Sequence, residues 1–421
     1  MSDLSILWRE SSGEAFSAPP LEGGHRTELA IVGGGFTGCA AALEAAGQGA
    51  DVTLLEADTI GHGGSGRNVG LVNAGLWLPP DAVAGTLGAP AGERLNRILA
   101  AAPDVVFGLI DRYRIACEPV RNGTLHLAHA PRGVSDLRKR HAQMVARGAP
   151  VTLLDGQEAC NRTGTDRFHG ALHDARAGTL QPLAYARGLA RAAVECGAKV
   201  FENSRVDGIF EQKGEWCLRT AGGTLTASRL LLATNAYHRA LGPVDPPDVP
   251  VVNYFQLATE PLGSNLAGDV LPGAEGCWDT GLIMSSLRRD ATGRVILGGM
   301  GDADTLGIQA GWARRKLKRL FPRLADAAIT HAWAGKISMT EDHLPRILRI
   351  GEGGYAVFGY SGRGIAPGTV FGQAAARALL DGDEADLPIG AVDAHHERLP
   401  VLRTRFFETG ARLVHMISER R

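Results

Sequence analysis

Three glycines and one carboxylate carry the clearest chemical signal in the sequence. An apolar run typical of a buried strand leads directly into Gly33, Gly35 and Gly38, in the spacing G-x-G-x-x-G. Gly33 permits a tight turn, Gly35 lets the backbone approach a pyrophosphate, and Gly38 lets a helix pack against the strand. Glu56 ends the next apolar strand, where a carboxylate can accept both hydroxyls of an adenosine ribose. The pattern predicts a dinucleotide site at a helix N-terminus; the alternative is a glycine-rich turn in another α/β protein.

A second glycine-rich segment, residues 61–73, follows the acidic residue closely. It is too rich in glycine for a regular strand or helix, and it carries the polar side chains of Ser65, Arg67 and Asn68. Such a loop can wrap a phosphate or a ring with its backbone N–H groups. A flexible surface loop is the alternative, but a ligand lying across the strand ends would have to touch this segment.

Two further apolar strands end in small or polar residues. Residues 230–233 run into Thr234 and Asn235, and another strand runs into the glycine-rich turn over residues 359–369. A helix over residues 370–380 follows that turn at once. The free N–H groups of its first turn could face an anion or a polar ring edge, and a structural helix cap is the alternative.

Three side chains are candidates for the chemistry itself. Lys336 is one of only six lysines; it could attract oxygen or stabilise a reduced ring by its charge, or it could be a surface lysine. Arg363 could bind a substrate carboxylate bidentately, or it could bond to backbone carbonyls. Tyr254 and Gln256 share one face of the strand expected over residues 251–259, so both could line a pocket. Ordinary sheet packing is the alternative for that pair.

The elements that must position these groups alternate between helix and strand. Helical periodicity covers residues 91–117, and Pro103 is expected to break it into two helices. The other expected helices span residues 133–147, 183–196 and 312–320. Further expected strands span residues 124–128, 151–155, 199–201 and 294–299, and residues 216–220 and 224–227 predict a hairpin. The prolines at positions 243, 246, 247 and 250 indicate a linker.

Composition excludes several classes of protein. The 421 residues suffice for two domains or for one large interleaved one, and the formal net charge of -1 gives no global field that would attract nucleic acid. The six cysteines show no C-x-x-C pair and no zinc spacing, so we expect reduced thiols and no metal. Residues 1–27 lack the apolar region of a signal peptide, and no apolar run is long enough to span a membrane. A cytoplasmic enzyme is therefore the default prediction.

The C-terminal segment, residues 398–421, is amphipathic. Leu402, Phe406, Leu413 and Ile417 fall on one helical face, and six arginines lie elsewhere in the segment. Such a helix could lie on a membrane surface. We predict instead a docked C-terminal helix with a solvated face.

Together these segments resemble the FAD-dependent D-amino-acid-oxidase-like superfamily, and most closely the γ-glutamylputrescine oxidase and glycine/sarcosine oxidase type. The resemblance covers nearly the whole chain and rests on five motifs in the right order: residues 32–38, residues 64–70, residues 233–237, Trp333-x-Gly335 with Thr340-x-Asp342, and residues 359–365. It implies an α/β fold (α+β overall) with a Rossmann-like FAD-binding domain interleaved with a mixed-sheet substrate domain.

The same resemblance implies where the domains and the cofactor contacts lie. Residues 1–80, 150–242 and 333–421 would form a discontinuous FAD-binding domain, with a C-terminal helix over residues 396–421, and residues 81–149 and 243–332 would form the substrate domain. The implied FAD contacts are Gly33, Gly35, Phe36, Thr37, Gly38, Glu56, Ala57, Gly64, Ser65, Arg67, Asn68, Val69, Gly70, Leu71, Val206, Ala233, Thr234, Asn235, Gly335, Gly362, Arg363, Gly364, Ile365 and Thr369. Many relatives carry a histidine where Arg363 stands. No cysteine lies between Ala332 and Pro345, near which some relatives attach the flavin, so non-covalent FAD is expected.

The implied reaction is hydride transfer to flavin N5 from a C–H bond next to an amine. It gives an imine that hydrolyses, with oxygen as the expected acceptor; Lys336, Arg363 and Tyr254 are the residues expected nearest the chemistry. The expected partners are a small amine or amino acid and an electron acceptor, with no nucleic acid and no integral membrane segment. Two alternatives stay open: a dehydrogenase of the same fold that passes electrons to a quinone at a membrane, and a non-catalytic FAD-holding subunit.

Overall fold

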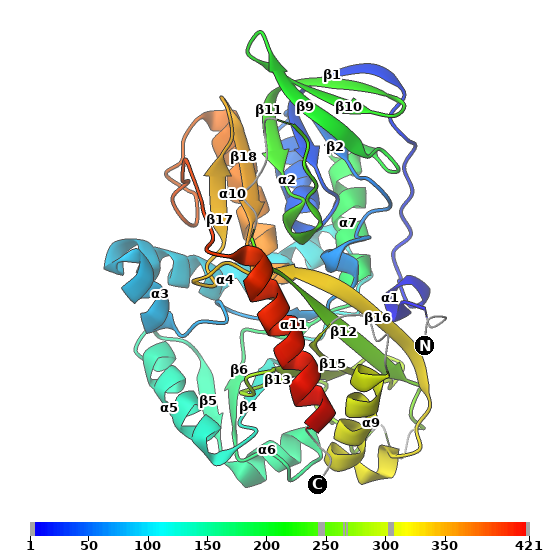
Figure 1. Cartoon of the computed structure of the whole chain (residues 1–421), viewed down its shortest axis with the longest axis vertical. Coiled ribbons are helices and arrows are strands. Elements are labelled where there is room, and N and C mark those ends of the chain that lie inside the picture. The colour runs from blue at the N-terminus through cyan, green and yellow to red at the C-terminus, as the bar shows by residue number, and fades with distance from the viewer. Residues whose placement is uncertain (1–4, 243–248, 264–265, 267, 302–306, 418–421) are drawn as a thin grey trace.

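Two large sheets organise the computed structural model, which describes residues 5–242, 249–263, 266, 268–301 and 307–417 (Figure 1). The first sheet has the strand order β17-β18-β11-β1-β2-β8. Its parallel strands are β1 (Gly23–Val32), β2 (Val52–Leu55), β8 (Lys199–Phe201), β11 (Gly223–Leu232) and β18 (Gly354–Phe358), and β17 (Arg346–Arg349) pairs antiparallel to β18. Strands β9 (Val206–Gln212) and β10 (Glu215–Thr220) extend from β11 as antiparallel neighbours. The carboxyl ends of β1, β2 and β11 therefore meet at one edge, where the glycine turn lies.

Helices α2 (Phe36–Gly47), α7 (Pro182–Glu195) and α10 (Ile365–Asp381) pack on one face of this sheet (Figure 1). Small residues make the packing close: a Cβ at Gly372 in α10 would lie 2.2 Å from the carbonyl oxygen of Thr37 in α2. The buried alanines of α2, α7 and α10 belong to one apolar core with β1 and β2. Close contact between α2 and α10 fixes the start of both helices beside the same turn.

The second sheet has the strand order β16-β12-β15-β14-β13-β4-β6-β5. Its strands are β4 (Thr124–Leu127), β5 (Val151–Leu154), β6 (Ala171–Asp174), β12 (Val251–Thr259), β13 (Gly276–Asp279), β14 (Ser285–Arg289), β15 (Val295–Met300) and β16 (Ile329–Ser338). The short strands β3 (Leu71–Val72) and β7 (Gly178–Thr179) form a separate antiparallel pair. Strand β12 alternates, so Phe255 and Leu257 enter the core formed with α9 (Ile308–Leu320), while Tyr254 and Gln256 line the opposite side.

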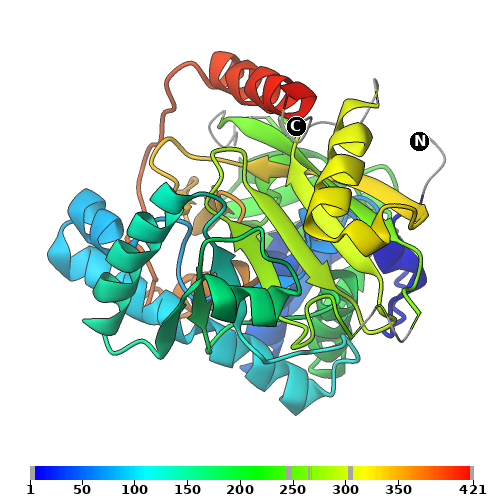
Figure 2. The same cartoon turned by 90° about the horizontal axis from the view of Figure 1, so that it is seen from below.

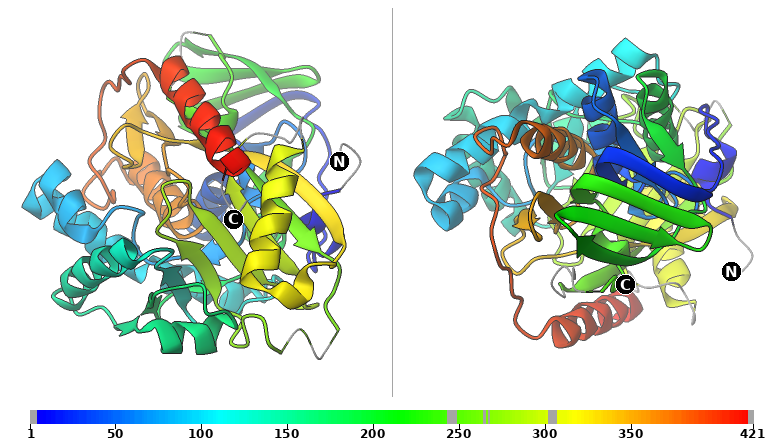
Figure 3. Two further views of the ribbon diagram at one scale, coloured as in Figure 1. Left: turned by 60° about the horizontal axis from the view of Figure 1, so that its bottom comes forward. Right: turned by 90° about the horizontal axis from the view of Figure 1, so that it is seen from above.

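The remaining helices surround the second sheet and the junction of the two sheets (Figure 2). They are α1 (Leu7–Glu10), α3 (Pro80–Leu87), α4 (Ala89–Tyr113), α5 (Pro131–Val145), α6 (Gly156–Thr163) and α11 (Pro400–Ile417), with short 3₁₀ turns at Gly64–Gly66, Asn235–Tyr237 and Pro322–Leu324. Helices α9 and α11 contact each other and lie on the same side of the molecule, as the left view of Figure 3 shows.

Helix α4 corrects one expectation, because it continues through Pro103 instead of breaking there. Proline removes one intrahelical hydrogen bond, which normally breaks or kinks a helix. Here the buried residues Leu99, Ala102, Val106 and Ile110 form one stripe across the proline. Burial of that stripe on both sides of Pro103 holds the two halves in one helix.

Two other boundaries also differ from the expectation. The strand expected over residues 230–233 is the end of the long strand β11, whose first half forms the hairpin with β10. Helix α10 begins at Ile365, inside the turn expected over residues 359–369. Most of the proline-rich linker, residues 243–248, lies outside the described residues.

The strands of the second sheet do not all fall within the residue ranges expected for the substrate domain. Strands β5 and β6 fall in the segment 150–242, expected for FAD binding, yet both pair in the second sheet. Strand β16 begins at Ile329 and also pairs there, with β12. Helix α11 packs against α9 and β12. By sheet pairing, then, the second layer extends beyond residues 81–149 and 243–332.

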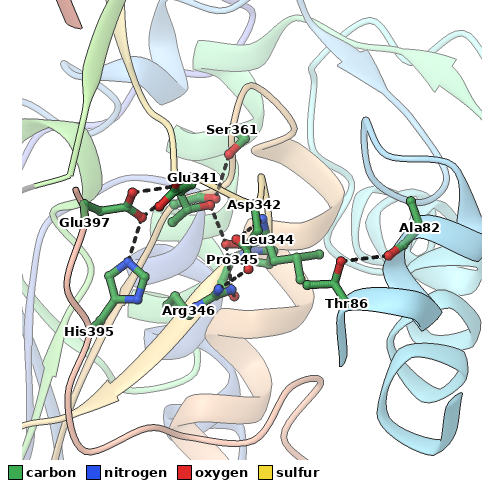
Figure 4. A network of polar contacts seen from close by, with 12 residues as sticks. Ala82, Thr86, Glu341, Asp342, Leu344, Pro345, Arg346, Ser361, His395 and Glu397 are labelled. Atoms are coloured by element: carbon green, nitrogen blue, oxygen red, sulfur yellow. Dashed lines mark hydrogen bonds and ion pairs between the residues drawn. The ribbon is translucent and has the colours of Figure 1, made fainter. Parts of the chain in front are cut away.

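A buried carboxylate, that of Glu397, connects α11 to the loop that follows β16. Figure 4 shows its contacts with Glu341 and His395. Glu397 accepts hydrogen bonds from the backbone N–H of Glu341 at 3.0 Å, and it pairs with His395 at 2.8 Å and with Arg403 of α11 at 3.0 Å. Within the loop, Thr340 donates to the carbonyl of Leu344 at 2.8 Å. These contacts fix the loop that carries the Thr340-x-Asp342 motif.

Candidate active site

The turn after β1 has no room for side chains. Gly33 has φ +110°, and a Cβ there would lie 2.9 Å from the carbonyl oxygen of Ala233. A Cβ at Gly38 would lie 1.9 Å from the carbonyl oxygen of Gly33, and one at Gly35 would lie 2.8 Å from Oγ of Ser65. Gly35 precedes α2 and gives it no side-chain cap. Apart from the N–H of Phe36, which donates to Oγ of Ser65, the amides at the start of α2 can therefore donate to an anion.

Glu56 closes the same turn from the end of β2. Its carboxylate accepts hydrogen bonds from the backbone N–H groups of Gly34 at 2.7 Å and Asp58 at 2.9 Å. Burial raises the pKa of this carboxyl above its ordinary value. The acid thus lies beside the glycine turn, as a ribose-binding carboxylate must.

The loop over residues 61–73 holds its own shape through two polar side chains. The amide of Asn68 donates to the carbonyls of Gly64 and Ser65, and its oxygen accepts from the N–H of Gly70. Arg67 donates to backbone carbonyls at 2.8 and 3.0 Å. These bonds position the loop against the start of α2, where Ser65 accepts from the N–H of Phe36 at 3.0 Å.

One cavity of about 620 Å³ reaches from this turn to the second sheet. The glycine turn, Glu56 and the 61–73 loop form part of its wall, and β12, β13 and the turn before α10 form another part. The expected residues that line it are Gly33, Gly35, Phe36, Thr37, Glu56, Ala57, Gly64, Ser65, Asn68, Val69, Leu71, Val206, Ala233, Thr234, Asn235, Tyr254, Lys336, Gly362, Arg363, Gly364 and Ile365. The structure thus brings segments distant in sequence to a single cavity.

Five expected contact residues lie behind this wall instead of on it: Gly38, Arg67, Gly70, Gly335 and Thr369. A Cβ at Gly335 would lie 2.6 Å from the hydroxyl of Tyr254, so the bare glycine lets that ring pack over β16. A Cβ at Gly70 would lie 2.2 Å from the carbonyl of Leu180. Thr369 is fully buried and its hydroxyl lies 3.1 Å from that of Tyr185. These residues support the wall through close packing.

The part of the cavity next to Trp278 of β13 contains a cationic group. The Cζ of Arg363 lies 4.2 Å from the ring centroid of Trp278. Arg363 is about nine-tenths buried, and among the described residues no carboxylate forms an ion pair with it. Burial, together with the charge of Arg140, lowers the pKa of Arg363 to about 9. The group is still protonated at neutral pH, so it is a buried charge that favours an anionic ligand.

Two further side chains lie against the ring of Trp278, and one of them, Arg140, adds positive charge. The ring of His126 stacks on Trp278 with centroids 3.4 Å apart, and burial holds the pKa of this histidine well below its ordinary value. Arg140 lies over the same ring at 5.8 Å and donates to the carbonyl of Trp77. Asp174 is the acid whose negative charge acts on Arg363, and it already forms an ion pair with Arg176. This end of the cavity is therefore electropositive.

Polar atoms from β12 and β16 face the same cavity. Oε1 of Gln256 and Oγ of Ser338 are buried without a hydrogen-bond partner in the described part of the chain, and both residues line the cavity. Burial raises the pKa of Tyr254 well above its ordinary value, so its hydroxyl is protonated. It donates to the carbonyl of Gly64 at 3.4 Å, a long contact. Unpaired buried acceptors are costly unless a ligand satisfies them.

Lys336 lies at the rim of the cavity. It is exposed, its Nζ lies 5.8 Å from the ring centroid of Tyr237, and its backbone N–H donates to the Tyr237 hydroxyl at 3.1 Å. The side chain thus belongs to the cavity wall while it remains exposed to solvent.

One residue of the cavity wall, Trp278, and two side chains that lie against it escaped the sequence-based reasoning. Trp278 lies in the four-residue strand β13, and no motif or periodicity distinguishes it. Its neighbours His126 and Arg140 come from β4 and from the polar helix α5. The pairing of β13 with β4 places His126 opposite Trp278, and a single sequence does not reveal that pairing.

The residues present fit an adenine dinucleotide. The turn at Gly33, Gly35 and Gly38 leaves space that any side chain would fill, and Glu56 stands beside it. In the described part of the chain, no group of His, Cys, Asp and Glu side chains is arranged to hold a metal ion. Over the same described ranges, none of the helices combines the length and apolar character that crossing a bilayer requires.

Comparison with known proteins adds four findings of similarity. A family model, DAO, described as FAD dependent oxidoreductase, matches residues 28–378. A probable oxidoreductase, OrdL, from Rhizobium meliloti is 32% identical over 374 residues, covering 88% of this chain and 87% of that protein. A gamma-glutamylputrescine oxidoreductase from Escherichia coli is 30% identical over 364 residues, covering 85% and 84%. The crystal structure of glycine oxidase from Geobacillus kaustophilus aligns with a TM-score of 0.74 and 22% identity, covering 88% of this chain and 100% of that one.

Proposed function

Because the chain belongs to the DAO family of FAD-dependent oxidoreductases, we propose that it oxidises a C–N bond of an amine or amino acid with non-covalent FAD. The family resemblance and the mixed α/β fold expected from the sequence are confirmed. The observation that carries the proposal is the single cavity, which is lined at once by the dinucleotide turn and by the unpaired cation Arg363.

The first-sheet residues would hold the cofactor. The amides at the start of α2 would bind its diphosphate, Glu56 its adenosine ribose, and Val206 would lie beside its adenine. When bound, FAD supplies the acceptor for the hydride that leaves the substrate carbon. No covalent attachment is expected, because no cysteine lies between Ala332 and Pro345.

Arg363, in the turn between β18 of the first sheet and α10, would hold the substrate together with residues of the second sheet. Arg363 would bind a substrate carboxylate through its planar N–H donors, with Trp278 fixing the plane of the guanidinium. The unpaired oxygens of Gln256 and Ser338 would accept hydrogen bonds from the substrate amine. Such bonds orient the C–H bond beside nitrogen toward the cofactor, and the product imine then hydrolyses in water.

The electron acceptor is proposed to be oxygen. Lys336 supplies a positive charge at the cavity rim, where it would stabilise negative charge that develops as oxygen is reduced. We also propose a cytoplasmic location, which the six unpaired cysteine thiols support.

The test is anaerobic bleaching of the purified yellow protein. The panel contains primary, secondary and γ-glutamylated amines and D- and L-amino acids, each followed at the flavin absorbance maxima. Bleaching by at least one of these substrates, and recovery of colour with peroxide release on admitting oxygen, is expected. If every amine and amino acid fails to bleach FAD-loaded protein, the oxidase proposal is wrong and the non-catalytic alternative stands. If colour returns only when a quinone analogue is added, the electron acceptor is a quinone and not oxygen.

A further inference from the structure

Helix α11 turns its apolar stripe toward solvent. Phe406 is 74% exposed, Leu402 57% and Leu413 53%, and Met416 on the same side is also exposed. A helix that packs on a globular protein normally buries this stripe. Most of the large exposed apolar side chains in the described part of the chain lie between residues 399 and 416, so the patch is concentrated and not scattered.

The opposite side of α11 is firmly docked, so the helix is not free to roll its stripe inward. His415 is fully buried and stacks on Trp312 of α9 with ring centroids 4.3 Å apart. Asn253 of β12 donates to Glu408 at 2.6 Å, and the N–H of Val251 donates to the hydroxyl of Thr404 at 3.2 Å. The outward direction of the stripe is therefore fixed by polar contacts along the whole helix.

Basic side chains are exposed both on α11 and on α9, the helix that contacts it. Arg314, Lys318 and Arg319 are exposed on α9, which contacts α11 and contains no acidic residue. Arg405 is exposed on α11 itself. The single acid of α11, Glu408, is directed to Asn253. Helices α9 and α11 lie together on one side of the molecule (Figure 3, left), and we call the surface they form the α9–α11 face.

We propose that the α9–α11 face docks this protein on the surface of a bilayer that contains anionic phospholipids. An apolar stripe flanked by arginine and lysine is the pattern of a helix that lies in the plane of a membrane interface. Lipid phosphates would place negative charge opposite these basic side chains, and the formal net charge of -1 for the whole chain shows that the basic character is local. A second copy of the chain fits less well, since a two-fold contact would bring like charges together.

This proposal is independent of the reaction in the cavity. No cavity-lining residue belongs to α9 or α11, so loss of docking and loss of oxidation are separate outcomes. A docked enzyme would stand next to acceptors dissolved in the bilayer.

The test is flotation of the full-length FAD-loaded protein with lipid vesicles. One set of vesicles contains phosphatidylcholine alone, and the other contains phosphatidylcholine and phosphatidylglycerol in equal amounts. The protein is expected to float with the anionic vesicles only, and added salt is expected to reduce the floating fraction. Protein that stays at the bottom with both vesicles, or floats equally with both, overturns the proposal.

Surface variants separate docking from misfolding. The triple variant Leu402→Ser, Phe406→Ser, Leu413→Ser and the double variant Lys318→Glu, Arg405→Glu should each bind anionic vesicles roughly tenfold less or weaker still, with unchanged flavin absorbance. Phe210→Ser and Lys213→Glu are the matched controls, since both residues are exposed on the β9–β10 hairpin at the other end of the molecule (Figure 1), and they should float like the parent protein. Normal flotation of the triple variant, or a dimer in size-exclusion chromatography that the triple variant abolishes, contradicts a lipid partner.

Discussion

The guanidinium of Arg363 lies over the ring of Trp278, with its Cζ 4.2 Å from the ring centroid. The ring face attracts the cation without occupying its N–H donors, which stay available for a ligand. His126 stacks on the same ring, and Arg140 lies 5.8 Å from it. The arrangement holds a cationic hydrogen-bond donor at a fixed place in the cavity.

Removal of the Arg363 cation should weaken the binding of substrates that carry a carboxylate more than that of substrates that lack one. Arg363→Gln is expected to raise KM for a carboxylate-bearing substrate by about 10–100-fold, the loss of one charged hydrogen-bonded pair, with a smaller effect on kcat. KM for the corresponding amide should change little. Arg363→Lys keeps the charge but not the planar fork, so it should recover only part of the loss. Steady-state kinetics on each acid and amide pair measures this, with exposed Arg219→Gln as control. Equal losses for acid and amide would contradict carboxylate binding.

The glycine turn offers a matched pair of substitutions in α2. Gly38→Ala places a Cβ 1.9 Å from a backbone oxygen, so it should cost about 3 kcal/mol or more and should abolish FAD binding. Gly47→Ala meets no atom within 4 Å and should stabilise the protein by up to about 1 kcal/mol. Denaturant unfolding and the flavin content after purification report both effects. A Gly38→Ala protein that retains FAD would show that the turn is not the dinucleotide site.

Glu56 should control cofactor affinity. Glu56→Gln keeps the shape of the side chain but removes its charge, and a charge-assisted hydrogen bond to ribose is worth about 1–3 kcal/mol. FAD affinity should therefore fall by roughly tenfold or more in a fluorescence titration of the apoprotein. Asp58→Asn, a change at a neighbouring acid that pairs with His62, should leave the affinity near that of the parent. The assignment fails if both variants bind FAD equally well.

Lys336 should affect the rate at which oxygen reoxidises the reduced enzyme and not the rate at which substrate reduces it. Lys336→Met removes the positive charge at the rim and should slow the reaction of the anaerobically reduced enzyme with oxygen by about tenfold or more. The rate of bleaching by substrate should stay nearly constant. Stopped-flow absorbance separates the two half-reactions, and Lys213→Met is the control. An unchanged oxygen rate would make Lys336 an ordinary surface lysine.

Acid should loosen the docking of α11. Burial, together with the charges of Lys316 and Arg315, lowers the pKa of His415 from 6.5 to about 4. The unfolded chain therefore takes up a proton at this residue before the folded one does, so the contribution to stability is complete above pH 6.5 and is lost as the pH falls toward 4. The loss amounts to roughly 2–3 kcal/mol.

The comparison of His415→Phe with the parent isolates that contribution, because phenylalanine keeps a ring against Trp312 but does not titrate. Unfolding free energies measured between pH 7 and pH 4 should fall less steeply in this variant. His396→Phe, at an exposed position, should follow the parent curve. Parallel curves for the parent and His415→Phe would exclude the effect.

The sequence predicts best those parts whose chemistry is local. The spacing of Gly33, Gly35 and Gly38 is a backbone requirement of one turn, and that turn stands where it was expected, with Glu56 beside it. Trp278 could not be found in this way, because its role depends on the pairing of β13 with β4. A local rule also failed at Pro103, where burial on both sides of the proline outweighs the lost hydrogen bond.

The C-terminal helix shows another limit of sequence periodicity. Periodicity places Leu402, Phe406 and Leu413 on one face, and the structure confirms a docked helix. The direction of that face depends instead on contacts such as that of His415 with Trp312, which no repeat in the sequence encodes. The helix was therefore predictable and its orientation was not.

The contacts of the Glu397 carboxylate determine where the chain can be truncated to remove α11 without disturbing the cavity wall. It supports the backbone at Glu341 and receives Arg403, so a truncation that begins upstream of it would strip the loop of its brace along with the helix. That loop adjoins Ser338, whose carbonyl accepts from the N–H of Ser361 in the cavity wall. A truncated protein that ends just after Glu397 would lack α11 but keep the contact of Glu397 with the backbone of Glu341. A protein that ends a few residues earlier would lose both, so a loss of membrane docking could not be separated from a change in the cavity wall.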